Sequence, residues 1–109
     1  MSHYVPDAWV IVKVSSPRNP TFYRVFAGWY GGFVGSDSWK LNSGITEIED
    51  MGKYYNIFGQ TGSCYQCYKD IERMTGYMSS LYAYWLEDVP EGYSFEHINF
   101  SELPADLIF

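Results

Sequence analysis

Basic residues are scarce in this sequence, and its last part has none. The 109 residues carry seven Lys and Arg against 13 Asp and Glu, for a net charge of −6. Acids and bases balance over residues 1–86, whereas residues 87–109 hold six acids and no Lys or Arg. Long nucleic acid binds to basic surfaces that displace its counterions, so we exclude it as a partner. A small anionic ligand on the neutral part of the chain stays compatible with this balance.

Cysteine and long apolar runs are equally sparse. Two cysteines are too few for a disulfide scaffold. No apolar run approaches the ~20 residues that cross a bilayer, and no charged-then-apolar leader opens the chain. We therefore expect no membrane association, reduced thiols and a cytoplasmic location.

Aromatic residues are abundant instead, at 20% of the chain with 11 Tyr and 4 Trp. They are densest between Phe26 and Ile45, where large rings alternate with glycines. Glycine permits sharp turns and close approach, and Trp and Tyr combine flat contact surface with a hydrogen-bonding group. This segment is the best candidate for a recognition surface.

Period-two and β-branched patterns predict strands over most of the first 69 residues. After a lead-in over residues 1–7, the predicted strands are Ala8–Ser15, Thr21–Trp29, Ser38–Leu41, Ile45–Asp50, Lys53–Phe58 and Cys64–Lys69. Short turns between them favour antiparallel pairing. The pattern over residues 6–69 predicts an antiparallel sheet of five or six strands, as a meander or a small barrel.

The period changes after residue 73. Apolar residues then recur at three- and four-residue spacing, which predicts one amphipathic helix over residues 75–88 that ends before Pro90. Its N-cap is Thr75 or, because Gly76 weakens the first turn, Ser79. Residues 89–109 form an acidic tail that ends in Leu-Ile-Phe. This apolar end either packs on the sheet or docks on a neighbouring subunit or partner. The whole chain is predicted to be one α+β domain, residues 1–109.

Two loops rich in Gly, Ser and Asn, over residues 36–44 and 59–63, resemble loops that cradle a phosphate or carboxylate. The second lacks the lysine and following helix of a P-loop, and either could be a plain hairpin connection. Flat bases stack on aromatic rings, although any single ring here could instead belong to the core. The ligand-binding residues predicted on this basis are Arg24, Trp29, Tyr30, Ser38, Trp39, Lys40, Asn42, Ser43, Thr61 and Ser63. Of these, Arg24 or Lys40 would offset ligand charge, unless they are ordinary surface residues.

No catalytic or metal-binding arrangement is predicted. Cys64 and Cys67 have CxxC spacing, but side chains three apart on a strand diverge, and no helix begins there to lower a thiol pKa. His97 beside Glu96 could act as an acid or base, yet a lone His in a strand-like segment is usually structural. With no triad or paired carboxylates recoverable, we expect no enzyme, no cofactor and no metal.

Several short segments of this chain resemble small uncharacterised proteins of tailed bacteriophages. They are Pro6-Asp7-Ala8-Trp9, Ala27-Gly28-Trp29, Asp37-Ser38-Trp39, Asn42-Ser43-Gly44-Ile45 and Gly62-Ser63. The likeness covers roughly residues 6–69 and brings no known activity with it. It implies a small accessory protein acting in the cytoplasm of an infected bacterium.

Three functions are compatible with this context. The first is a non-enzymatic protein that sequesters a small polar ligand, such as a nucleotide-derived signal. The second is an inhibitor that blocks a host protein through the acidic tail and exposed aromatic residues. An enzyme of unknown chemistry is the third. Ring-rich strand edges also suit self-association, so a homo-oligomer is left open.

Overall fold

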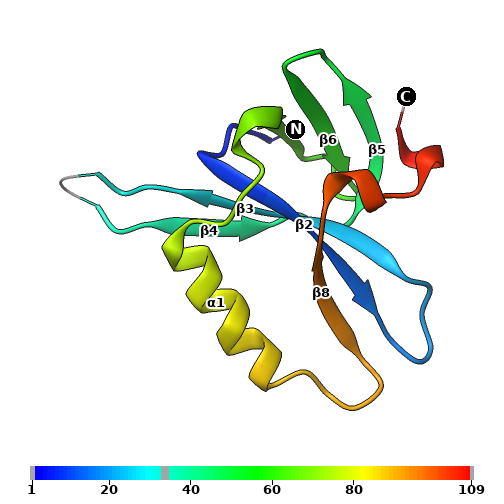
Figure 1. Ribbon diagram of the computed structural model, residues 1–109. Helices are drawn as coiled ribbons and strands as arrows, with labels where there is room; N and C mark the ends of the chain where they lie inside the picture. The colour runs from blue at the N-terminus through cyan, green and yellow to red at the C-terminus, as the bar shows by residue number, and fades with distance from the viewer. Residues whose placement is uncertain (1, 33–34, 109) are drawn as a thin grey trace.

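The structure is a computed structural model that describes residues 2–32 and 35–108. In that part of the chain, eight strands form two four-stranded sheets, and the helix α1 (Gly76–Glu87) lies against one of them (Figure 1). Sheet I has the order β4 (Ser38–Leu41), β3 (Phe22–Trp29), β2 (Ala8–Ser15), β8 (Ser94–Ile98). Sheet II has the order β1 (His3–Tyr4), β7 (Cys64–Tyr68), β6 (Tyr54–Gly59), β5 (Ile45–Asp50). All pairings are antiparallel except that of β1 with β7.

The predicted α+β domain with antiparallel strands and one helix is confirmed. The single meander or barrel of five or six strands is wrong, because the chain passes from sheet I to sheet II between β4 and β5. Two strands lie where none was predicted. One is β1, within the supposed lead-in, and the other is β8, within the acidic tail.

Strand β2 is buried on both of its faces. Ala8, Val10 and Val12 pack toward α1, whereas Trp9 and Ile11 belong to the core between the two sheets. Successive side chains of a strand point to opposite faces, so a strand covered on both sides reads as one continuous apolar run. The order of layers is therefore sheet II, sheet I, α1.

Helix α1 begins as the sequence predicts. The Oγ1 atom of Thr75 accepts a hydrogen bond from the backbone N–H of Met78 at 3.1 Å, the geometry of an N-cap. Met78 is fully buried and packs over Gly28 of β3, where a Cβ atom would lie 2.4 Å from the sulfur. Within the described residues, no helix has the length and apolar character needed to cross a bilayer.

The acidic tail folds back on its own chain. Its strand β8 pairs with β2, and the Phe100 ring stacks on Tyr55 with 3.8 Å between centroids. The backbone N–H of Phe100 also donates to Glu72 Oε2 at 2.7 Å. Beyond the short 3₁₀ helices η2 (Phe100–Glu102) and η3 (Ala105–Leu107), Ile108 forms a β-bridge with β5. Of the apolar end Leu-Ile-Phe, Leu107 packs against the core and Ile108 is 37% exposed, and Phe109 lies outside the described residues.

The contact between Met78 and Gly28 generates a stability prediction. Gly28→Ala should lower the free energy of unfolding by about 1–3 kcal/mol, because the added methyl group overpacks a fully buried site. Urea denaturation measures this change. The matched control is Gly76→Ala in α1, where no atom lies within 4 Å of the new Cβ. Alanine favours helix, so the control should leave stability unchanged or slightly raised. Equal stability of both variants would contradict the packing argument.

Candidate functional site

A groove of about 480 Å³ lies between the N-terminal segment and the β3–β4 hairpin. It combines the rings of Tyr4 and Trp29 with an ammonium, an imidazole and a hydroxyl group. Its lining residues are His3, Tyr4, Val5, Trp29, Ser38, Trp39 and Lys40. Four of these residues belong to the predicted ligand-binding set: Trp29, Ser38, Trp39 and Lys40.

The wall of the groove is built around Trp29 and Tyr4. The indole Nε1–H of Trp29 donates to the carbonyl oxygen of Val5 at 2.9 Å, which ties the N-terminal segment to β3. The Tyr4 ring meets Trp29 edge-on, with 6.3 Å between centroids. The ammonium of Lys40 lies over the Tyr4 ring, 5.1 Å from its centroid. A cation and two rings thus stand together at one wall.

The register of the hairpin decides which predicted residues act together. Trp29 pairs with Ser38, and Lys40 stands two residues further along β4, so all three point to the same face of sheet I. Trp39 pairs with Gly28 and points to the opposite face, where its ring lies 4.9 Å from that of Trp85 in α1. The two indoles therefore cannot form one stacking platform.

Arg24 and Asn42 belong to a different structural feature, the passage from sheet I to sheet II. Asn42 is 2% exposed, and its Oδ1 accepts a hydrogen bond from the backbone N–H of Val25 at 2.8 Å. Its backbone carbonyl accepts one from Arg24 Nε at 2.6 Å. Burial lowers the pKa of the Arg24 guanidinium. Neither residue lines the groove, and both have structural partners.

The two polar loops do meet each other, but at a second hollow. The Oγ of Ser43 accepts a hydrogen bond from the backbone N–H of Thr61 at 3.1 Å, and the Gln60 N–H donates to the Gly44 carbonyl at 3.0 Å. This hollow, of about 430 Å³, is lined by Asn19, Pro20, Thr21, Phe22, Ser43 and Gln60. No residue lines both hollows. The predicted hydroxyl groups of Ser43 and Thr61 are therefore not part of the groove.

The two other predicted residues line neither hollow. Tyr30 is 54% exposed, and its backbone N–H donates to Asp7 Oδ2 at 2.9 Å. Ser63 accepts a hydrogen bond from the Gly59 N–H through its backbone carbonyl at 2.9 Å. Phe33, which the sequence places in the same aromatic stretch, lies outside the described residues.

Sequence reasoning missed His3, Tyr4 and Val5, which form one side of the groove. They are held there because β1 runs parallel to β7, pairing His3 with Cys64. A parallel partner so distant in sequence leaves no local spacing that could reveal a two-residue strand. The only available signal was an aromatic and a β-branched residue ahead of Pro6.

Reactive groups elsewhere have structural surroundings. Cys64 and Cys67 are free thiols and both are buried, and burial raises the pKa of each. His97 is exposed and lines neither the groove nor the second hollow. Its backbone N–H donates to the Tyr82 hydroxyl. Among residues 2–32 and 35–108, no group of three His, Cys, Asp or Glu side chains could hold a metal ion.

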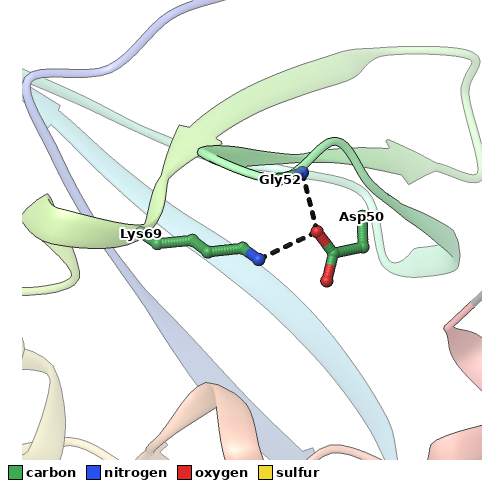
Figure 2. Close-up of polar contacts among 3 residues, drawn as sticks. All are labelled: Asp50, Gly52 and Lys69. Atoms are coloured by element: carbon green, nitrogen blue, oxygen red, sulfur yellow. Dashed lines mark hydrogen bonds and ion pairs between the residues drawn. The ribbon is translucent and has the colours of Figure 1, made fainter.

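A third hollow, of about 280 Å³, is lined by residues that include Gly52 and Lys69. Lys69 also forms an ion pair with Asp50, which Figure 2 shows. The ammonium of Lys69 and the backbone N–H of Gly52 both donate to the same oxygen of Asp50, at 2.8 and 2.9 Å. Lys69 also lies 4.7 Å from the centroid of the Tyr55 ring. The Asp50–Lys69 ion pair therefore connects the β5–β6 turn to the residue that follows β7.

The groove has the groups of a binding site. His3 Nε2 is hydrogen-bonded to the Gln66 side chain at 3.1 Å, so the imidazole is held by a structural partner, not by the Ser38 hydroxyl. A nucleophile needs a base within hydrogen-bond reach, and the His3 imidazole is hydrogen-bonded to Gln66 instead of Ser38.

Comparisons with protein-family models, with curated proteins and with solved structures found no match to this chain. Its function is accordingly inferred from the geometry of the groove.

The Asp50–Lys69 pair generates a titration prediction. Lys69, followed by the Gly52 N–H, lowers the pKa of the Asp50 carboxyl. The stabilising effect of Asp50 is therefore complete above the pKa of an unfolded-chain aspartate, and is lost as the pH falls through the lower folded-state pKa. Carboxyl titration by NMR should place Asp50 below an ordinary aspartate, and Lys69→Met should raise it. An Asp50 pKa unchanged by Lys69→Met would contradict this assignment, and Lys53→Met serves as the control.

Burial of both cysteines generates a reactivity prediction. The reactive species is the thiolate, so buried thiols with raised pKa values should react slowly with a disulfide reagent at neutral pH. We expect little labelling of the native protein and two labelled thiols after denaturation in urea. Rapid native labelling of both would restore the redox interpretation of the CxxC spacing.

Proposed function

We propose that this chain is a non-enzymatic accessory protein that binds and sequesters a small, flat, negatively charged ligand of the nucleotide class. The observation that carries the proposal is the placement of Trp29, Ser38 and Lys40 on one face of sheet I, opposite Tyr4. Sequestration requires affinity and no turnover, which fits a groove with ring, cation and hydroxyl groups.

The groups of the groove match the parts of such a ligand. A base stacked on an aromatic ring gains roughly 1–3 kcal/mol. The Lys40 ammonium offers a charge-assisted hydrogen bond to a phosphate, and the Ser38 hydroxyl offers a neutral one. Pockets for small ligands usually span about 300–1,000 Å³, and the groove, at about 480 Å³, has room for one nucleotide.

The likeness to small tailed-phage proteins supplies a biological context for the proposal. A phage accessory protein that removes a signalling nucleotide would blunt a host defence without chemistry. This context rests on the short segments of residues 6–69 and on no other finding.

Thermal-shift measurements against mono-, di- and cyclic nucleotides test the ligand. A ligand that binds only the native state stabilises it by RT ln(1 + [L]/Kd), so one class should raise the melting temperature in a concentration-dependent way. Lys40→Met should then weaken binding by about tenfold, since it removes a charge-assisted contact. Lys53→Met is the matched control, because Lys53 is an exposed lysine at the third hollow. A flat response to every nucleotide, or equal loss in both variants, would overturn the proposal.

The alternative is an inhibitor that blocks a host protein. Exposed Tyr93 favours it, since it lies within residues 87–109, which hold the excess of acids. Ile98, Phe100 and Leu103 of the tail are buried, so such a contact would use the surface of the folded tail. Glu91 and Glu96 are both exposed, so replacing them with Gln should leave the melting temperature unchanged and weaken a contact with a host protein.

A further inference from the structure

The groove offers a ligand one ammonium group. Lys40 is the one Lys or Arg among the residues that line it, and no Asp or Glu lines it. The Lys40 ammonium is not used inside the chain, because the one ion pair among the described residues joins Asp50 and Lys69. An anion bound in the groove therefore meets a single opposite charge at close range.

Two carboxylates stand just beyond the groove. Asp7 Oδ2 accepts a hydrogen bond from the Tyr30 N–H at 2.9 Å, and Asp37 Oδ1 accepts one from the Gly31 N–H at 3.0 Å. Tyr30 and Gly31 directly follow β3, and Asp37 directly precedes β4. Both carboxylates thus lie at the end of the β3–β4 hairpin whose last pair of residues, Trp29 and Ser38, lines the groove.

One aromatic ring of the groove is open to a base. The Lys40 ammonium lies 5.1 Å from the centroid of the Tyr4 ring, and the Tyr65 ring lies against the same ring with 5.0 Å between centroids. Trp29 meets Tyr4 edge-on and therefore presents its own flat surface in another direction. Trp29 is the ring left for stacking, and one ring stacks one base. The groove thus suits a mononucleotide.

We propose that the ligand is a mononucleotide with one negative charge, which means a phosphodiester such as a 3′,5′-cyclic nucleotide. This inference rests on the proposed function and adds the charge of the ligand to it. A phosphodiester has one ionised oxygen, which the Lys40 ammonium can match. A phosphomonoester carries about −1.5 to −2 at pH 7, and its second charge finds no second cation among the lining residues.

Repulsion from the two carboxylates decides the order of affinities. Asp7 and Asp37 outnumber the single ammonium, so an additional negative charge on the ligand meets net repulsion. Asp7 is exposed and Asp37 is half-buried, so water and salt screen this repulsion in part. We therefore expect each additional charge to weaken binding by about 3–10-fold. The cyclic nucleotide should bind most tightly and the triphosphate most weakly.

Isothermal titration calorimetry with nucleotides of equal base and different charge tests this order. The probes are the 3′,5′-cyclic monophosphates, 5′-monophosphates and 5′-triphosphates of adenosine, guanosine, cytidine and uridine. Measurements at about pH 8 without Mg²⁺ give a phosphomonoester its full second charge. For the base that binds best, the cyclic nucleotide should have the lowest Kd. A 5′-monophosphate or triphosphate of equal or lower Kd would overturn the inference and leave the proposed function standing. If none of the probes binds, the proposed function falls and this inference falls with it.

Exchange of the two carboxylates for amides tests the cause of the preference. Asp7→Asn and Asp37→Asn each keep an oxygen that can accept the backbone hydrogen bond while removing a charge. The double variant should keep its melting temperature and gain affinity in proportion to ligand charge, so that the preference for the cyclic nucleotide narrows by about 3–10-fold. Asp106→Asn is the matched control, because Asp106 is an exposed carboxylate in η3 that does not line the groove. An unchanged preference in the double variant, or equal narrowing in the control, would overturn the inference.

Discussion

One buried indole holds the two sheets together. Trp9 on β2 is fully buried, and its Nε1–H donates to the carbonyl oxygen of Tyr68 on β7 at 2.7 Å. Its ring meets Tyr55 and Phe100 edge-on, at 6.2 and 6.0 Å between centroids. A buried carbonyl without a donor costs roughly 1–3 kcal/mol, so this bond restricts how the sheets can be placed. The same ring receives the returning tail, and sheet I, sheet II and the C-terminal segment therefore depend on one side chain.

Local patterns predicted the elements that local interactions define. The run Ala8–Ser15 is a strand because it is buried on both faces, and the helix begins at Thr75 because its hydroxyl group caps a nearby N–H. The division into two sheets was not predictable, since it depends on Asn42 completing the ladder of sheet I just before the chain leaves it. Strand β8 was not predicted, because the acidic composition of residues 87–109 resembles an exposed tail when the partner strand is unknown.

The candidate site likewise combines residues that a local hairpin places with residues that only long-range pairing places. Trp29, Ser38 and Lys40 were predicted together and lie together, because one hairpin sets their register. Tyr4 was not predicted, because a strand distant in sequence places it. Ser43 and Thr61 were expected to join the tryptophans, yet the turn into sheet II carries Ser43 to another hollow, where its Oγ accepts a hydrogen bond from the Thr61 N–H. Residue type indicated the chemistry, and long-range pairing decided where it gathers.

The small size of β1 has a consequence for anyone who handles this protein. One side of the groove is fastened by two paired residues, by the Cys64 N–H on the Ser2 carbonyl and by the Trp29 indole on Val5. A segment held by so few bonds opens at little free-energy cost while the core stays folded. A bulky group attached ahead of His3 would pull on this fastening and crowd the groove.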